Sequence, residues 1–210
     1  MSNRRLRITL SVALFLIGLL VVCLIALFSG IEIVEAQTEA PNLVATAGNS
    51  WNEASFPVEN FQAYTSPFGY RRSPTNPRRV QFHNGLDIAA PKGSYIRNWF
   101  TGTVIKVGSR GACGTHLIIK SGDWKHSYCH MQGRVMRLNG RLYMIDRAGG
   151  IKIRYGQQVT SGMRIGRIGM TGRTTGPHLH WVIRYKGKYV DPGAVLRQMY
   201  AMQGSNIPKS

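Results

Sequence analysis

The most hydrophobic part of the chain is its beginning, where Ile8 to Phe28 form an almost continuous apolar run without a charge. Arg4, Arg5 and Arg7 precede this run, and the small residues Val34 and Ala36 follow it. This order is typical of a secretory signal with a cleavage site near residue 36. The alternative is a permanent membrane anchor, because residues 8–28 reach the roughly 20 residues that span a bilayer. Both alternatives predict an exported protein, periplasmic or in the cell envelope, with the arginines on the cytoplasmic side.

Beyond this segment the pattern changes twice. Residues 37–55 are polar, small and aperiodic, which indicates a linker. From Phe56 onward, short β-branched or aromatic runs are bounded by glycine, as in Thr103–Val107, His116–Ile119 and Trp181–Tyr185. The sequence therefore predicts a mainly β fold, with one compact antiparallel sheet domain over residues 56–202 and a flexible tail over 203–210.

Turn and helix signals refine this picture. Gly122-Asp123 predicts a hairpin that pairs the strand of Tyr128 with that of Leu117 to Ile119. Residues 133–154 have the features of an inserted second hairpin, with turns at Asn139-Gly140 and Gly149-Gly150. One short helix is predicted from Pro192 to about Met202, with Asp191 as its N-cap.

The charge of the chain is strongly positive, at +18. Removal of residues 1–36 takes away three arginines and two glutamates and leaves +17. A field of this strength favours polyanionic partners. Since an exported protein meets the cell envelope first, we expect anionic cell-envelope polymers as partners and no nucleic acid.

Two cysteines remain in the exported part, Cys113 and Cys129. An even number of cysteines in an oxidising compartment suggests one disulfide, with two buried free thiols as the alternative.

Histidines occur in three short motifs: His83-Asn84-Gly85-Leu86-Asp87, Tyr128-Cys129-His130 and His178-Leu179-His180. On a strand, residues two apart share a face, so His178 and His180 should point the same way, as should Tyr128 and His130, with Cys129 pointing to the other face. His83 and Asp87, four residues apart, could either share a face or bind an ion from the two ends of a turn at Gly85. Catalytic zinc sites have three protein ligands of this chemical type and an open position for water. The motifs therefore predict metal-assisted hydrolysis, with further histidines to move protons.

The chain also resembles a known family. The segment TSPFGYRRSPTNPRRVQFHNGLDIAAPKGSYI, the YCHM block and GQQVTSGMRIGRIGMTGRTTGPHLHWVI are similar to the lysostaphin-type zinc peptidoglycan endopeptidases, from about Ser66 to Pro192. The resemblance implies Zn²⁺ bound by His83, Asp87 and His180. It implies a non-ligand catalytic pair, His130 and His178. The implied substrate is bacterial peptidoglycan, cut at a peptide bond of its cross-links or stem peptides.

Two other functions remain as alternatives. A non-catalytic wall-binding or hydrolase-activating module could share the fold, although such relatives typically lack ligands and all five positions are filled here. A secreted polyanion-binding protein would explain the charge and leave the five residues unexplained. His116 and His126 match no functional position, and we expect them to be exposed or packing residues.

Overall fold

The structure, a computed structural model, describes residues 51–74 and 76–204. The predicted signal or anchor segment (1–36), most of the predicted linker (37–50) and the end of the predicted tail (205–210) lie outside the described residues. Within the described ranges, no helix has the length and apolar character needed to cross a membrane.

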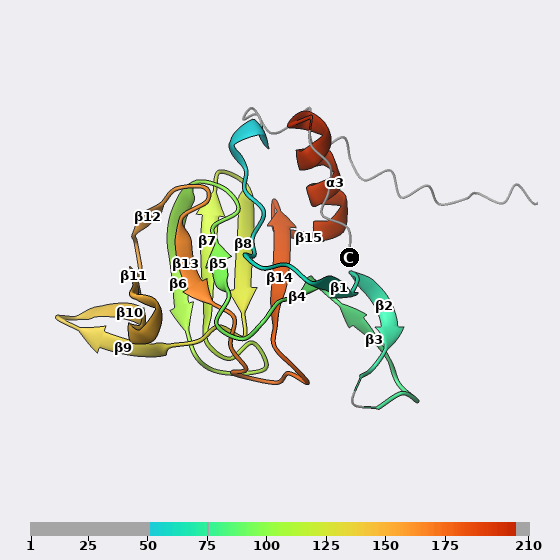
Figure 1. The fold of residues 1–210 in the computed structure, drawn as a ribbon, viewed down its shortest axis with the longest axis horizontal. Coiled ribbons are helices and arrows are strands. Elements are labelled where there is room, and N and C mark those ends of the chain that lie inside the picture. Colours follow the sequence, from blue (N-terminus) through green and yellow to red (C-terminus); the bar gives the residue numbers. More distant parts are fainter. Residues whose placement is uncertain (1–50, 75, 205–210) are drawn as a thin grey trace, which may run out of the picture. The chain divides into compact units, whose positions relative to one another are not determined.

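The largest sheet has eight strands, all paired antiparallel, in the order β1-β4-β14-β8-β7-β6-β12, with β15 on β14 (Figure 1). Its strands are β1 (Ala63–Ser66), β4 (Leu86–Ala89), β6 (Gly102–Gly108), β7 (His116–Ser121), β8 (Trp124–Cys129), β12 (Gln158–Val159), β14 (His178–Tyr185) and β15 (Lys188–Val190). Strand β14 lies between β4 and β8 and thus joins two parts of the chain that are distant in sequence.

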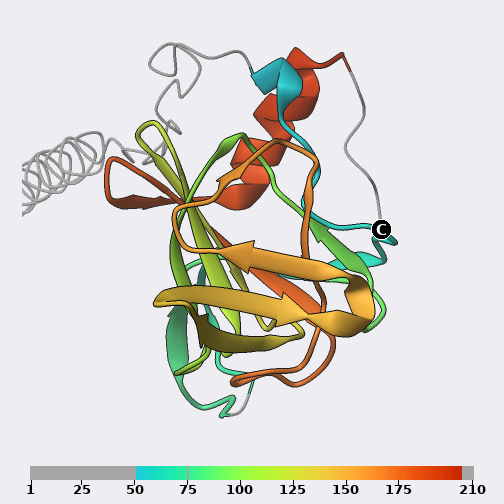
Figure 2. The same ribbon diagram turned by 90° about the vertical axis from the view of Figure 1, so that its left-hand side faces the viewer.

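Three smaller sheets accompany the main one. They consist of β9 (Arg134–Leu138), β10 (Arg141–Asp146) and β11 (Ile151–Arg154); of β5 (Tyr95–Arg97) with β13 (Arg164–Arg167); and of β2 (Gly69–Arg72) with β3 (Val80–His83). Figure 2 shows the yellow-to-orange β9–β11 segment as a layer of its own beside the main sheet. The described helices are η1 (Trp51–Glu53), η2 (Arg147–Gly149) and α3 (Pro192–Met202). The predicted mainly β fold with a short C-terminal helix is confirmed.

The core lies against one face of the main sheet. Along β14, Leu179, Trp181 and Ile183 are fully buried, while the residues between them point to the opposite face. Four tryptophans form the centre of this core through edge-on ring contacts with centroids 5.4–5.8 Å apart: Trp51, Trp99, Trp124 and Trp181. Trp51 belongs to the stretch that its polar neighbours mark as linker, yet it is only 1% exposed.

The predicted hairpin turns and the predicted helix cap are present in the structure. Strands β7 and β8 form a hairpin in which Leu117 pairs with Tyr128, and Gly122 in its turn has φ 57°. The β9–β10 turn contains Asn139 and Gly140, both with positive φ, as a two-residue hairpin loop of the favoured twist requires. Asp191 is the N-cap of helix α3, and its carboxylate accepts a hydrogen bond from the Gly193 amide at 2.8 Å. These three predictions are confirmed.

Candidate metal centre

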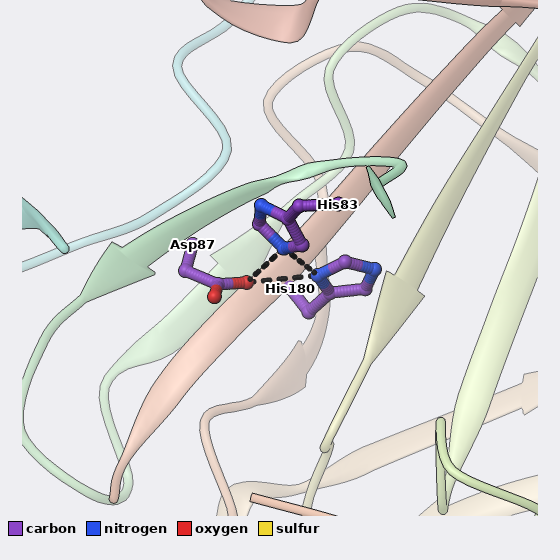
Figure 3. A group of neighbouring side chains, drawn as sticks. All are labelled: His83, Asp87 and His180. Carbon is purple, nitrogen blue, oxygen red and sulfur yellow. Dashed lines mark hydrogen bonds and ion pairs between the residues drawn. The ribbon is translucent and has the colours of Figure 1, made fainter. Parts of the chain in front are cut away.

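Three side chains converge on one point from three strands. His83 ends β3, Asp87 lies in β4, and His180 lies in β14 directly opposite Asp87 in the register of the two strands. The His83 Nε2 atom lies 3.1 Å from Asp87 Oδ1 and 3.0 Å from His180 Nδ1 (Figure 3). The distance between His180 Nδ1 and Asp87 Oδ1 is 2.8 Å. The group is largely buried and could hold a metal ion.

Hydrogen bonds behind the two imidazoles fix which nitrogen is free. His83 Nδ1 donates to the Pro67 carbonyl at 2.7 Å, so its Nε2 presents a lone pair to the centre. His180 Nε2 donates to Asn84 Oδ1 at 3.2 Å, so its Nδ1 does the same. With neutral imidazoles, three acceptor atoms then face one another without a donor between them. This arrangement fits a bound cation, and such outer hydrogen bonds are the usual support of metal-binding histidines.

Asp87 is held as a carboxylate. Burial opposes its ionisation, but in the metal-free protein hydrogen bonds and charge interactions from His180 and His83 outweigh burial and hold its pKa well below the usual range, and a bound cation would take over this role when the two rings present their lone pairs. Arg71 lies on the other carboxylate oxygen, with Nη2 at 3.7 Å from Oδ2.

The turn between His83 and Asp87 needs glycine. A Cβ atom at Gly85 would lie 2.6 Å from the Trp181 carbonyl oxygen and 2.8 Å from His180 Cε1. Both distances are shorter than any that a real Cβ atom makes. Because glycine has no side chain, the turn can approach β14 this closely. The sequence left open how His83 and Asp87 meet, and the structure shows them on either side of this turn.

His130 and His178 lie beside the metal centre. The ring centroids of this pair are 4.8 Å apart, and His178 Nε2 is 3.6 Å from Asp87 Oδ1. His178 Nδ1 donates to the Gly176 carbonyl at 2.9 Å, and His130 Nδ1 donates to the Thr171 carbonyl at 2.9 Å. In both residues Nε2 is the nitrogen left to exchange a proton. Burial lowers the pKa of His130, with the Thr171 hydrogen bond opposing this, so the neutral form is favoured. All five predicted site residues therefore lie in one place.

The expected orientation of Cys129 is wrong. Cys129 pairs with His180, and Tyr128 pairs with Trp181; residues directly opposite in an antiparallel pair share a face. Cys129 is thus on the side of the metal centre, and Tyr128 is in the core. His130 follows the end of β8 with φ 60°, and this left-handed conformation breaks the strand alternation and puts its ring on the same side as Cys129.

The sulfurs of Cys113 and Cys129 lie side by side, with Cα atoms 4.9 Å apart, as in a disulfide. Both residues line the cleft of the metal centre rather than its rear. The His130 amide also donates to the Cys113 carbonyl at 2.8 Å, so the Cys113 loop contacts the backbone of His130 directly.

The remaining histidines differ in their surroundings. His126 is fully buried in the core, where its ring hydrogen-bonds the Ser121 and Tyr128 hydroxyls at 2.9 and 2.8 Å. It is a packing residue, as expected. His116 is also largely buried, and its Nδ1 donates to the Gly114 carbonyl at 2.7 Å, but it lines the cleft.

The centre opens into a cleft of about 830 Å³. Its floor is the outer face of β6, β7, β8 and β14, and its walls include the β2–β3 hairpin and the loops around Arg110 and Thr174.

The residues that orient the four histidines by hydrogen bonds were not predicted from the sequence. Asn84 stands inside the first histidine motif and could have been found there, whereas the Pro67, Thr171 and Gly176 groups are backbone carbonyls that no side-chain pattern reveals.

The comparisons with known proteins cover the part of the chain that holds these residues. The model of Peptidase family M23 matches residues 81–192, which hold all five histidine and aspartate positions. The chain is 35% identical over 131 residues to the DD-carboxypeptidase/endopeptidase Mpg of Neisseria meningitidis, covering 62% of this chain and 26% of that protein. It is 31% identical over 137 residues to the peptidoglycan DD-endopeptidase ShyA of Vibrio cholerae, covering 65% and 28%.

A solved structure shares the fold. The catalytic domain of the prophage-encoded M23 protein EnpA from Enterococcus faecalis, solved as a point mutant, matches with TM-score 0.51 and 28% identity over 67% of this chain and 95% of that one. The chain spans about a quarter of the length of the two curated relatives. Because the family match covers more than half of its 210 residues, this chain belongs to peptidase family M23.

Proposed function

We propose that this protein is a zinc-dependent endopeptidase that hydrolyses peptide bonds in bacterial peptidoglycan, in its cross-links or stem peptides. The observation that carries the proposal is the convergence of His83 Nε2, His180 Nδ1 and Asp87 Oδ1 as three acceptors, with both imidazoles oriented from behind. Metal coordination explains such an arrangement, whereas a structural hydrogen-bond network would place donors against acceptors.

The donor set fits zinc. Tetrahedral zinc with bonds of about 2.0–2.1 Å to nitrogen and oxygen has ligand atoms about 3.3 Å apart. The observed separations of 2.8–3.1 Å are close to that value. Two neutral imidazoles and one carboxylate are also a ligand set found in catalytic zinc sites, in which the fourth position is kept for water.

Zinc bound by His83, Asp87 and His180 would supply the Lewis acidity that acidifies a water molecule and polarises a scissile carbonyl. His178 and His130 would serve proton transfer, because each donates through Nδ1 to a backbone carbonyl and so keeps Nε2 free for the reacting groups. Once protonated at Nε2, either ring could donate a hydrogen bond to a developing oxyanion or leaving amine. We assign these two as the catalytic residues.

Substrate and location are part of the proposal. Two matched proteins are named as peptidoglycan DD-endopeptidase and as DD-carboxypeptidase/endopeptidase, which supports peptidoglycan as the substrate class. The apolar segment 8–28 supports export to the periplasm or cell envelope, by a cleaved signal or a retained anchor. The charge of +18 supports contact with anionic envelope polymers.

The test is digestion of isolated sacculi by the purified 210-residue protein, followed by analysis of the released fragments. We expect peptide-bond cleavage that a chelator stops and added zinc restores, and no cleavage by His180→Ala. Cleavage that survives complete removal of metal would contradict the proposal. Zinc-replete protein that binds sacculi without cutting them would favour the non-catalytic alternative.

A further inference from the structure

The cleft is lined by many cations and one anion. The cationic side chains at the cleft are Arg71, Lys106, Arg110, Lys125, Arg173 and Arg184. The one acidic residue among the cleft-lining residues is Asp87, which belongs to the metal centre. Arg71 contacts Asp87, but no carboxylate of the described part of the chain lies within ion-pair distance of the other five cations. The cleft therefore has unneutralised positive charge.

Strand register shows where these charges stand on the floor. Val182, Ser127 and Ile118 pair across β14, β8 and β7 and form an uncharged row, which ends at Lys106 of β6. The next row along the strands starts with Arg184 directly opposite Lys125. An uncharged centre is thus bordered by cations on two sides.

Arg184 and Lys125 are an unfavourable pair in the absence of a ligand. Side chains directly opposite in an antiparallel pair have Cβ atoms about 4.5–5.5 Å apart, and like charges at this separation destabilise a sheet. Lys125 also faces Lys120 on its other side. Without an acidic side chain between these cations, an anion from outside would relieve the repulsion.

Arg184 is already oriented. Its guanidinium stacks on the Tyr189 ring, 4.1 Å from the centroid, and donates to the Tyr189 hydroxyl. The Asn84 amide donates to the same hydroxyl at 3.1 Å. A fixed guanidinium loses less conformational entropy on binding a carboxylate than a free one, and its planar fork matches a carboxylate in shape.

The spacing suits a peptide. Arg184 is four residues from His180 on one strand, which at about 3.3 Å per residue places it roughly 13 Å from the metal ligand. This distance is the length of about four residues of extended chain. A peptide with its scissile bond at the metal centre would therefore reach the cations with a side chain or terminus a few residues away.

We propose that Lys106, Lys125 and Arg184 form a carboxylate-binding subsite, and that the preferred substrate is a stem peptide whose carboxylates are free rather than amidated. The inference rests on the proposed peptidoglycan hydrolysis and adds a charge requirement to it. Val182, Ser127 and Ile118 would receive the small uncharged side chains between the scissile bond and the carboxylate.

The test uses the zinc-loaded 210-residue protein carrying His178→Ala, so that ligands bind without being cut. Two synthetic stem peptides of identical sequence, one with free carboxylates and one with the same groups as carboxamides, are titrated by calorimetry. We expect the carboxylate peptide to bind about five- to tenfold more tightly. Adding Lys125→Gln should lower the ratio of the two affinities, because it removes one of the three cations, and Lys125→Arg should preserve the ratio.

Lys152→Gln is the matched control, because it removes the same charge from an exposed position on β11, outside the cleft. A ratio near one in the parent protein would overturn the inference, as would an equal loss of the ratio in Lys152→Gln and Lys125→Gln. Sacculus digestion by the wild type reports separately on the proposed function. Digestion with an affinity ratio of one would therefore reject the subsite alone, and a high ratio without digestion would reject the hydrolase alone.

Discussion

The side-chain oxygen of Asn84 lies 3.2 Å from Nε2 of His180 and accepts its proton in a hydrogen bond. This contact decides which nitrogen of His180 faces the metal centre, although Asn84 is not itself a ligand. Its amide nitrogen is directed to Tyr189, so the orientation of the whole Asn84 side chain is fixed from two sides.

The first prediction is that Asn84→Ala weakens metal binding without removing it. Loss of an outer hydrogen bond of this type costs about 10- to 100-fold in metal affinity or activity. Competition with a chromogenic zinc chelator measures the change. Asn76→Ala, on the exposed loop between β2 and β3, should leave the affinity unaltered. Equal affinities for Asn84→Ala and the wild type would show that His180 is oriented by other contacts.

The second prediction separates zinc ligands from proton carriers. His180→Ala should lose zinc and activity together, because it removes one of three ligands. His178→Ala and His130→Ala should keep about one zinc per chain and lose about 10²- to 10⁴-fold in kcat, the usual cost of removing a positioned acid or base. Elemental analysis and single-turnover kinetics give the two readouts. Zinc loss from His178→Ala as complete as from His180→Ala would show that the two residues have been assigned the wrong roles.

The periodicity of the sequence correctly predicted which face of the sheet a side chain occupies within a strand, but not at the end of a strand. Alternation along His178 to Ile183 correctly placed the two histidines on one face, because a regular strand leaves no other choice. The same rule failed at Cys129 and His130, because a non-glycine residue with positive φ has no clear signature in a single sequence. Trp51 was likewise misjudged from its polar neighbours, since its partners Trp99 and Trp124 are distant in sequence.

The third prediction concerns the cysteine pair. Closure of a loop of about 15 residues is worth roughly 3 kcal/mol in the chain-entropy model, so reductant or Cys113→Ala should lower Tm. Because Cys113 contacts the His130 backbone, reduction should also lower kcat while zinc content stays near one per chain. Thiol titration of unfolded, unreduced protein checks the premise, and two reactive thiols from Cys113 and Cys129 would rule out the bond.

The fourth prediction concerns acid stability. Burial lowers the pKa of His126 to about 3, whereas in the unfolded chain it would be near 6.5. Below about pH 6.5 the unfolded state binds a proton that the folded state does not, so the free energy of unfolding should fall as pH drops from about 6.5 towards 3.

Urea unfolding across this pH range should show a shallower decline in His126→Gln than in the wild type, even though the variant starts from a lower stability. The exposed variant Lys125→Gln should keep the wild-type slope. Parallel pH profiles for His126→Gln and the wild type would mean that His126 takes up no additional proton on unfolding.

The fifth prediction concerns attachment to the wall. With a charge of +18, binding to sacculi should be largely electrostatic, and exposed charges are screened beyond about 8 Å at physiological ionic strength. Sedimentation of the His178→Ala protein with sacculi should therefore show release as salt rises, before salt slows cleavage of a small soluble peptide by the wild type. Retention that stays flat up to molar salt would instead favour attachment through uncharged contacts, which salt does not screen.

The placement of β14 between β4 and β8 has a consequence for when the candidate metal centre can form. His83 and His180 are 97 residues apart, and they meet once the late strand has paired with both of its earlier neighbours. A nascent or truncated chain that lacks β14 also lacks His178 and His180, so it lacks one of the three proposed ligands and one of the two proposed catalytic histidines. Under the proposed function, a chain folded in this way could not hydrolyse a peptide bond before its late strand has paired with β4 and β8.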